Sequence, residues 1–428
     1  MAEISFDSEG EFSLPDRYVL ICNASGAPNA NLAPIYQLGK ERIAAIAINC
    51  GVADRRQPTE QEQRSAIDPA SWLADFARDR LGLSQESIRI FDGDADNFCE
   101  WASIGKNSAV GWAHQFGLPV LANFQGGTTQ MSMGLAQALI DSDLDWMRLF
   151  LGKFPALAHI SVRIGGEIRD WINGTPVENV PLDILLEARG YERFDDPQTK
   201  ARSKFAVDHG REAARLMQRF KAGHYVSKDE RRSWLAALSG VNRACSDDKG
   251  RQYPFNIADS NGSVASHYEE PLGAAFWAGG NVHSDEHRHF LAGGWLEQGL
   301  FDKISRRVAD RRGWRVEANL SIRRTSGTSA VNEIDIVLMQ DEMLHLIEVK
   351  SGRDLSDLQE WGDKLVKLNR ILAGRPARSW IVAPSAWIES EAERLERTER
   401  LAKSGVTLLL GDRAIKALLK EIDQLNFG

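Results

Sequence analysis

Short apolar runs alternate with amphipathic stretches through the first third of the chain. Four of these runs predict strands, at residues 17–23, 41–50, 87–94 and 118–124. The Ala-rich run 41–50 fits a helix as well as a strand by its pattern alone. The stretches between the runs predict helices, the clearest at residues 71–83 and 131–142. Because strands that alternate with helices form parallel sheets, the pattern predicts a Rossmann-like α/β domain over residues 1–150.

The pattern weakens after this domain and sharpens again near residue 286. Residues 200–245 predict two short helices around a turn, as in a winged helix, and the polar, Gly- and Ser-rich residues 245–285 predict a loop. We therefore interpret residues 151–285 as a linker and helical segment. Residues 286–428 begin with a long amphipathic helix and continue with strands and further helices, which predicts an α/β/α sandwich.

The composition is that of a globular protein rather than of a disordered or fibrous one. Among 428 residues, 43% are hydrophobic and 26% are charged, and this length suits two or three domains. The cysteines Cys22, Cys50, Cys99 and Cys245 stand far apart. Their spacing argues against a disulfide framework or a zinc knuckle and for a reducing compartment. No apolar run reaches the length of a membrane span and the acidic first residues do not resemble an export signal, so we expect a cytoplasmic protein with no membrane partner.

The strongest candidate chemistry lies in two adjacent strands of the C-terminal domain. Asp335 falls in the strand 332–340, and Glu348 and Lys350 fall in the strand 344–352, after a tight turn. Residues two apart on a strand share a face, so Glu348 and Lys350 project together, and the hairpin brings Asp335 alongside them. This spacing of two carboxylates and a lysine is the pattern of PD-(D/E)xK nucleases.

These residue types suit metal-dependent cleavage of a phosphodiester. Two carboxylates can hold Mg²⁺ or Mn²⁺ through oxygen atoms, and the cation activates a water and polarises the scissile phosphate. The lysine orients or deprotonates that water and stabilises charge on the phosphate. The alternative is a pair of amphipathic strands with ordinary solvated charges. The apolar neighbours of Asp335 and Glu348 weigh against it, because burying an unpaired acid is costly.

Further side chains are candidates for the same site. Glu297, at the edge of an apolar helix face that precedes the strands, is the best candidate for a third carboxylate and metal ligand. Its alternative is an exposed helix glutamate. Glu333 shares the face of Asp335 and is a weaker candidate. Lys364, on the helix that follows, is a candidate for contact with a phosphate, but we expect it to be solvated.

A basic cluster stands beside these carboxylates in a chain whose net charge is −8. Residues 303–324 hold eight Lys or Arg against two acids, among them Arg306, Arg307, Arg311 and Arg312. The net charge excludes a protein that coats nucleic acid over its whole surface, whereas a local groove of this kind can track phosphates. We predict that these four arginines contact nucleic acid. The alternative is a solvated helix face.

A glycine-rich loop follows the strand 118–124 and opens the next helix. Successive backbone N–H groups in residues 123–135 can bind a phosphate or the polar edge of a ligand. The first strand also ends in a small, polar loop at residues 23–31, and α/β sheets bind ligands beyond the carboxyl ends of their strands. Neither loop has the spacing of a nicotinamide- or ATP-binding loop. The alternative is a simple helix cap.

The chain resembles the CARF-domain nucleases of type III CRISPR defence in the stretches NFQGGTTQMSMGL, LDILLEARGY, FLAGGWLEQGLF, NEIDIV and LIEVKSG. The resemblance implies a Rossmann-like CARF sensor joined to a PD-(D/E)xK nuclease. It also implies that a cyclic oligoadenylate, commonly cyclic tetra-adenylate, binds across a homodimer and activates cleavage of DNA or RNA with Mg²⁺ or Mn²⁺.

The resemblance further implies which residues contact the activator. The matching positions lie in the two loops, at Ser25, Asn29, Asn31, Gly126, Gly127, Thr128 and Met131. The family often has a lysine after GGT, where this chain has Thr129.

Two other functions stay open on the sequence. One is an ungated restriction- or repair-type nuclease whose N-terminal domain only dimerises. The other is a ligand-responsive DNA-binding regulator with an inactive nuclease domain, although the intact carboxylates and lysine argue against it. His283, His287 and His289 have the spacing of a zinc site, but no cysteine stands near them, and we interpret them as surface histidines.

Overall fold

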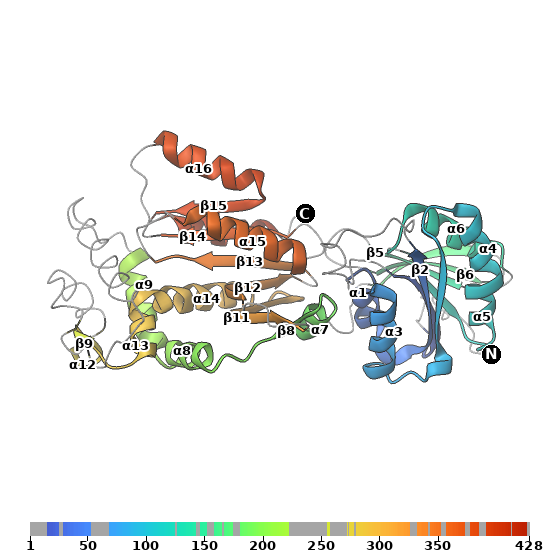
Figure 1. The fold of residues 1–428 in the computed structure, drawn as a ribbon, viewed down its shortest axis with the longest axis horizontal. Coiled ribbons are helices and arrows are strands. Elements are labelled where there is room, and N and C mark those ends of the chain that lie inside the picture. Colours follow the sequence, from blue (N-terminus) through green and yellow to red (C-terminus); the bar gives the residue numbers. More distant parts are fainter. Residues whose placement is uncertain are drawn as a thin grey trace. The chain divides into compact units, whose positions relative to one another are not determined.

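A computed structural model describes the chain as two compact units, Met1–Tyr191 and Glu192–Phe427, each with its own sheet (Figure 1). The residues that the structure describes are 15–24, 29–52, 68–124, 126–142, 146–151, 158–164, 167–173, 180–221, 255–256, 272, 274–277, 280–325, 332–340, 343–351, 357–372, 377–384, 391–411 and 413–425.

The first unit is built on a seven-stranded sheet in the order β3-β2-β1-β4-β5-β6-β7. Its strands are β1 (Tyr18–Asn23), β2 (Ile43–Val52), β3 (Ile88–Asp94), β4 (Val120–Asn123), β5 (Trp146–Leu151), β6 (Ala158–Ile164) and β7 (Glu167–Asn173). Neighbouring strands from β3 to β5 are parallel, whereas β6 and β7 are added antiparallel at one side.

Helices cover both faces of this sheet, with α1 and α3 on one face and α4, α5 and α6 on the other (Figure 1). The helices are α1 (Asn29–Leu38), α3 (Pro69–Asp79), α4 (Phe98–Ile104), α5 (Val110–His114), α6 (Thr129–Ile140) and α7 (Leu182–Glu187), with short turns η1 (Lys40–Arg42), η2 (Gln85–Ser87) and η3 (Gly105–Ala109). The central strand β1 is buried along its whole length, which explains its continuous apolar run.

The predicted Rossmann-like α/β fold is confirmed in this unit. The four predicted strands are β1, β2, β3 and β4, and the ambiguous Ala-rich run is the strand β2. The sheet also continues beyond residue 150, because β6 and β7 pair with β5 in an antiparallel extension that the sequence reasoning did not predict. Strands therefore extend into the range 151–285 that we interpreted as linker and helices.

The second unit is built on a six-stranded mixed sheet in the order β15-β14-β13-β12-β11-β8. Its strands are β8 (Tyr191–Arg193), β11 (Trp314–Arg324), β12 (Asn332–Gln340), β13 (Met343–Val349), β14 (Ser379–Ala383) and β15 (Val406–Leu410). The strands β11, β12 and β13 are antiparallel to one another, and β13, β14 and β15 are parallel. A separate two-stranded sheet pairs β9 (Phe255–Asn256) with β10 (Asn281–Val282).

The helices of the second unit confirm the α/β/α arrangement predicted for the C-terminal part. They are α8 (Pro197–Asp208), α9 (Gly210–Lys221), α12 (Ala274–Trp277), α13 (Asp285–His289), α14 (Trp295–Val308), α15 (Leu358–Leu372), α16 (Glu391–Lys403) and α17 (Ala414–Gln424), and the π-helical turn η6 (Phe290–Gly294) leads into α14. The predicted strand pair at 332–340 and 344–352 is β12 and β13. The turn predicted at Asp341–Glu342 lies outside the described residues.

One face of the second sheet packs against α14 and α17. Ile336 of β12 and Ile347 of β13 share a buried core with Leu300 of α14 and Leu418 of α17. Because side chains alternate across a strand, the residues between these apolar positions point to the other face. Asp335 and Glu348 lie on that other face, against which α15 packs. The alternation therefore separates the apolar core from the charged residues of the candidate site.

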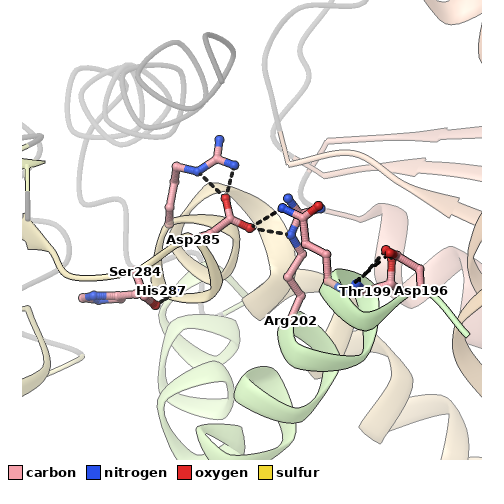
Figure 2. A network of polar contacts seen from close by, with 8 residues as sticks. Asp196, Thr199, Arg202, Ser284, Asp285 and His287 are labelled. Atoms are coloured by element: carbon pink, nitrogen blue, oxygen red, sulfur yellow. Dashed lines mark hydrogen bonds and ion pairs between the residues drawn. The ribbon is translucent and has the colours of Figure 1, made fainter. Parts of the chain in front are cut away.

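Helices α8 and α9 belong to the same core, although they fall in the range 151–285. A polar network holds α8 to α13, the helix before η6 (Figure 2). Asp285 accepts hydrogen bonds from Arg202 Nε at 2.9 Å and from Gln198 Nε2 at 3.0 Å, and it also pairs with Arg288. Burial alone would raise the pKa of Asp285, but these hydrogen bonds outweigh burial and hold it well below its usual range. The network fixes the segment that leads into α14.

The second half of the helix pair predicted at residues 200–245 lies outside the described residues. Residues 222–254, including the turn expected near Gly223–Ser227, are not among the described residues. The domain ranges 1–150, 151–285 and 286–428 therefore stay a prediction. The contacts within the chain divide it into two compact units near residue 191. None of the helices that the structure describes is long and apolar enough to cross a membrane.

Candidate active site

The hairpin of β12 and β13 places Asp335 and Glu348 opposite each other. The register pairs Ile336 with Ile347, and Asp335 and Glu348 are the next residues along the two strands. Both carboxylates are buried, with exposed fractions of 9% for Asp335 and 3% for Glu348. Asp335 Oδ2 accepts a hydrogen bond from the backbone N–H of Val349 at 2.6 Å, which fixes its orientation. Two acids predicted from separate strands thus meet at one point.

Lys350 joins the two carboxylates. Its Nζ donates to Glu348 Oε1 at 2.5 Å and lies 3.8 Å from Asp335 Oδ2. The ammonium also stands over the ring of Trp361 in α15, 5.2 Å from its centroid, a distance at which a cation is attracted to the ring. The backbone N–H of Lys350 donates to Val382 O, so the residue continues the pairing of β13 with β14. Contacts therefore hold both the backbone and the ammonium group of Lys350 in place.

Lys364, a candidate from the sequence for contact with a phosphate, lies in the site but contacts Glu348. It projects from α15, and its Nζ donates to Glu348 Oε2 at 3.0 Å and to Oε1 at 3.3 Å. We expected this lysine to be solvated, but its side chain is 31% exposed and is paired with a buried acid. The sequence contains no direct signal for this contact, because it depends on where α15 crosses β13.

Glu297 stands in the first turn of α14, and both Glu297 and Ser351, the residue that follows Lys350, lie near Gly293. Gly293 precedes the helix, and a Cβ there would lie 2.7 Å from Ser351 Oγ and 3.9 Å from Glu297 Oε1. Ser351 Oγ in turn donates to Ala292 O. A glycine is therefore required for the turn before α14 to lie against the end of β13, and this close packing brings Glu297 to the edge of the site.

Two carboxylates of this site, those of Asp335 and Glu297, are harder to ionise than ordinary ones. Burial raises the pKa of Asp335 to about 6, and Glu348 adds to this while Lys350 opposes it. The pKa of Glu297 is also well above its usual range, because of burial and then of the charge on Asp335. Burial alone would lower the pKa of Lys350, but the carboxylates of Asp335 and Glu348 outweigh it and raise the pKa. Lys350 is therefore a permanent cation between the two acids.

The donor set fits a divalent cation of the Mg²⁺ class. Such ions are usually bound through one or two carboxylates, with water and substrate phosphate as further ligands, and Asp335 and Glu348 supply two carboxylates at one position. Among the described residues, no three His, Cys, Asp or Glu side chains form a complete metal site. The ammonium groups of Lys350 and Lys364 instead contact the carboxylate of Glu348. A cation would therefore need a ligand from water or substrate, or a movement of Glu297.

The predicted nucleic-acid-binding arginines lie at the opposite end of α14 from Glu297. Arg307 and Arg311 both pair with Asp423 of α17, with Arg307 Nε at 2.9 Å and Arg311 Nη2 at 2.6 Å from Oδ1. Arg306 and Arg312 are exposed. Ten residues of helix separate Glu297 from Arg307, a rise of about 15 Å. Contact of these arginines with nucleic acid stays a prediction.

The glycine loop of the first unit has the predicted strand–loop–helix form. Thr128 caps α6, because its Oγ1 accepts from the backbone N–H of Met131 at 3.3 Å, and it also donates to Ala95 O. Gly127 is exposed and has φ of 77°, a conformation that favours glycine. A Cβ at Gly127 would lie 3.0 Å from Met131 Sδ and 3.1 Å from Asn23 Cβ. The loop therefore leaves no room for a side chain on its inner side.

Buried asparagines brace this loop to the ends of the parallel strands. Asn23, at the end of β1, donates from Nδ2 to Gly126 O at 3.0 Å. Asn49 in β2 donates to Asn23 Oδ1 at 3.3 Å, and Asn123 at the end of β4 donates to Asn31 Oδ1 at 3.0 Å. All four are at most 3% exposed. The sequence reasoning did not single out Asn23, Asn49 or Asn123, although each follows an apolar strand run.

The predicted activator-binding residues divide into three groups. Ser25 and the side chain of Asn29 lie outside the described residues. Asn31 and Met131 are buried, and Asn31 is engaged on both polar atoms, since its Nδ2 donates to Asn23 O at 2.8 Å and its Oδ1 accepts from Asn123. Gly126, Gly127 and Thr128 form the loop itself. Their contact with a ligand stays a prediction.

The interpretation of the three histidines as surface residues is wrong for His287. Its side chain is 5% exposed and packs against Phe205 and Phe276. Its Nδ1 accepts from the backbone N–H of His283 at 3.4 Å, while Ser284 caps the helix that carries it (Figure 2). His283 itself is exposed. An amphipathic helix that begins at Asp285 turns His287 inward, which the spacing alone did not reveal.

Comparison with known families identifies the C-terminal part. Residues 284–403 match the family model of the Card1-like endonuclease domain. This range contains Glu297, Asp335, Glu348, Lys350 and Lys364. The predicted resemblance to CARF-domain nucleases is thereby confirmed for this domain. A search of curated protein sequences finds no match.

Solved structures resemble the chain over nearly its whole length. The protein VC1899 from Vibrio cholerae has a TM-score of 0.62 and 17% identity, with 96% of this chain and 98% of that chain covered. Can2 from Sulfobacillus thermosulfidooxidans, solved in complex with cyclic tetra-adenylate, has a TM-score of 0.58 and 14% identity, with 95% and 99% covered. At these identities the likeness shows the fold. The chain thus has a Can-like fold with a Card1-like endonuclease domain.

Proposed function

We propose that the protein is a metal-dependent endonuclease that a cyclic oligoadenylate activates in type III CRISPR defence. The observation that carries the proposal is the buried pair Asp335 and Glu348, with the ammonium of Lys350 between them. Two buried acids beside a fixed lysine are expensive to maintain as a structural feature and are suited to phosphodiester hydrolysis. The Card1-like match over residues 284–403 supports the same chemistry.

Each residue has a role in the proposed cleavage. Asp335 and Glu348 would hold Mg²⁺ or Mn²⁺, with Glu297 as a further carboxylate at the edge. The cation, when bound, polarises the scissile phosphate and lowers the pKa of water. Lys350 orients the attacking water and stabilises negative charge on the phosphate. In the cation-free protein the two acids raise the pKa of Lys350 and hold it in its cationic form.

The first unit would act as the sensor. Gly127 and Thr128 lie where a strand ends and a helix begins, the position at which α/β sheets bind ligands. The buried asparagines give this loop a rigid support, which favours the binding of one defined ligand shape. The complex of Can2 with cyclic tetra-adenylate, a protein of the same fold, supports a cyclic oligoadenylate as the ligand and cyclic tetra-adenylate as the first to test.

A cleavage assay with four variables tests this function. The full chain is incubated with single- and double-stranded DNA and RNA, with and without Mn²⁺, and with and without cyclic tri-, tetra- and hexa-adenylate. We expect cleavage only when both cation and one activator are present, and none by Glu348→Ala. Cleavage that is independent of every cyclic oligoadenylate would favour the ungated nuclease. No cleavage under any condition, together with activator-dependent DNA binding, would favour the regulator.

The exposed arginines are the candidates for substrate contact on the nuclease surface. We propose that the exposed Arg306 and Arg312 contact phosphates. Arg307, which is also exposed, and Arg311 pair with Asp423. Charge reversal at Arg306 should then reduce the slope of affinity against salt concentration, because each phosphate contact releases condensed counterions. An unchanged slope would place this helix end away from the substrate.

A further inference from the structure

Glu348 contacts two lysines, which is more positive charge than one buried carboxylate requires. Lys350 Nζ lies 2.5 Å from Oε1, and Lys364 Nζ lies 3.0 Å from Oε2. Each oxygen of the carboxylate is therefore contacted by an ammonium group. These are the atoms that the proposed function assigns to a divalent cation.

The two lysines differ in how firmly they are held. Lys350 contacts Glu348 and Asp335 and stands over the ring of Trp361. Lys364 contacts Glu348 alone among these groups, through both oxygens. The side chains are similarly exposed, 31% for Lys364 and 25% for Lys350, so the two lysines differ in their number of partners. A flexible, partly exposed lysine can move its charged end into water at little cost. Lys364 is thus the lysine that can leave.

The local charge gives a reason for it to leave. Asp335 and Glu348 carry two negative charges, which Lys350 and Lys364 balance. A divalent cation added beside both lysines would meet two positive charges at close range in a buried site. Like charges at such separations repel strongly where water is excluded. Removal of one ammonium group relieves this repulsion and frees one carboxylate oxygen.

We propose that Lys364 is a positioning residue that occupies Glu348 in place of a divalent cation and is displaced when the cation binds. This inference rests on the proposed metal-dependent function. In the cation-free protein Lys364 fixes the orientation of Glu348 and keeps the site neutral. Lys364 therefore competes with the cation, so the cation binds less tightly than the carboxylates alone would allow.

Binding of Mn²⁺ to the full-length protein, without nucleic acid or activator, tests the proposal. The variant Lys364→Met keeps the aliphatic stem but removes the competing charge. We expect its Kd for Mn²⁺ to fall by roughly three- to tenfold, as expected for loss of one partly exposed ion pair. Isothermal titration calorimetry and the electron paramagnetic resonance signal of free Mn²⁺ measure it. Glu348 keeps Lys350 as a partner in this variant, so the buried acid is not left unpaired.

Two control variants separate competition from a structural role. Lys364→Arg keeps the positive charge and should bind Mn²⁺ no more tightly than the wild type. Lys367→Met removes an exposed lysine one turn further along α15 and should leave the Kd unchanged. If Lys364 only held Glu348 in shape, Lys364→Met would weaken Mn²⁺ binding. Weaker or unchanged binding by Lys364→Met therefore overturns the proposal.

Glu348→Ala distinguishes failure of this inference from failure of the proposed function. The number of Mn²⁺ ions bound is compared between the wild type and Glu348→Ala. An ion that only the wild type binds is the one that Glu348 holds. If the two proteins bind the same amount of Mn²⁺, Glu348 is not a metal ligand, and both proposals fall. The wild type can bind one more Mn²⁺ than Glu348→Ala while Lys364→Met binds that ion no more tightly than the wild type. In that case the metal site stands and only the proposed displacement of Lys364 is wrong.

Discussion

At the scale of one residue, two opposing effects act on the pKa of Lys350. Burial disfavours its ammonium group, but the two carboxylates beside it more than compensate and raise its pKa. The same burial raises the pKa of Asp335 to about 6, which Lys350 partly opposes. Removal of either charge would leave the other buried without an adequate partner. The acids and the lysine are therefore best regarded as one electrostatic unit.

Lys350→Ala should reduce the cleavage rate by about 10²- to 10⁴-fold, which is the usual worth of a positioned charge or acid–base group. The measurement is the single-turnover rate at saturating Mn²⁺ and activator. Lys367→Ala, an exposed lysine on α15, serves as the control and should cleave at the wild-type rate. A rate within a few-fold of wild type for Lys350→Ala would contradict the role assigned to it.

His345 should make the stability of the second unit depend on pH. Burial, with Arg378 adding to it, lowers the pKa of His345 from 6.5 to about 4. Between these values the unfolded chain binds a proton at His345 that the folded chain does not bind. Stability should therefore fall as the pH drops from about 6.5 to about 4, by at most about 1.4 kcal/mol per pH unit for this one group.

Urea unfolding of the wild type and of His345→Gln at pH 7 and pH 5 measures this effect. The glutamine cannot titrate, yet it retains an acceptor for the backbone N–H of Arg378, which donates to His345 Nδ1 at 3.1 Å. The wild type should lose more stability than the variant between the two pH values. Equal losses would show that His345 does not contribute.

At the scale of helices and strands, the sequence predicted the elements whose periodicity is simple. The apolar runs of β1, β3 and β4 and the hairpin of β12 and β13 were clear because buried strands are continuously apolar or alternate strictly, whereas the Ala-rich β2 also fitted a helix. The antiparallel strands β6 and β7 were missed. In β6, Ile160, Val162 and Ile164 alternate with polar residues, the pattern of a strand with one solvated face, and this alternation would have identified it.

The candidate site was predictable only where it follows from strand geometry. Glu348 and Lys350 share a face because they are two residues apart, and Asp335 joins them through a short hairpin. Lys364 was not predictable, because a helix lysine reaches a strand acid only at one crossing position of α15 over β13. Likewise, nothing in the sequence near Arg307 indicated that Asp423, more than a hundred residues later, would pair with it.

Packing of α9 against α14 should depend on Gly299. A Cβ at this position would lie 2.2 Å from Met217 Cγ, so the two helices touch through a glycine. Gly299→Ala should destabilise the second unit by about 1–3 kcal/mol, as overpacking of a dense core does. Gly210→Ala is the matched control, because a Cβ there meets nothing within 4 Å, and it should be neutral or slightly stabilising.

The denaturation midpoints of these two variants and of Gly299→Ala combined with Met217→Ala measure the contact. Met217→Ala alone should destabilise the buried core, so the contact is measured by a double-mutant cycle: Gly299→Ala should cost less stability in the Met217→Ala background than in the wild type. If Gly299→Ala were as stable as Gly210→Ala, the two helices would have room that the structure does not show.

At the scale of the whole molecule, we predict that the activated form is a two-fold homodimer. A cyclic oligoadenylate with an even number of units can present identical edges to two identical subunits, which suits a two-fold homodimer. The ligand can shift the protein toward an active state only if it binds that state more tightly than the resting one. Gly127 is the position where this requirement can be tested, because the loop admits no side chain there.

Gly127→Ala should abolish activation by cyclic tetra-adenylate, because the new Cβ meets Met131 and Asn23 and shifts the loop. Gly117→Ala is the matched control. It has a similar positive φ of 61°, but a Cβ there meets nothing within 4 Å, so it carries the same backbone strain without moving the loop. Calorimetric binding and activator-dependent cleavage are measured for both. Equal loss of response in the two variants would attribute the effect to general destabilisation.

The edge strand β8 determines where the chain can be divided for separate study. It lies beside β11, and the helices α8 and α9 that follow it share their core with Leu300 and Ile304. A fragment that starts at residue 286 would uncover these side chains and leave β11 with an unpaired edge, a template for aggregation. A fragment that starts near residue 180 keeps strand and helices together. We expect only the longer fragment to elute as a monodisperse species in size-exclusion chromatography.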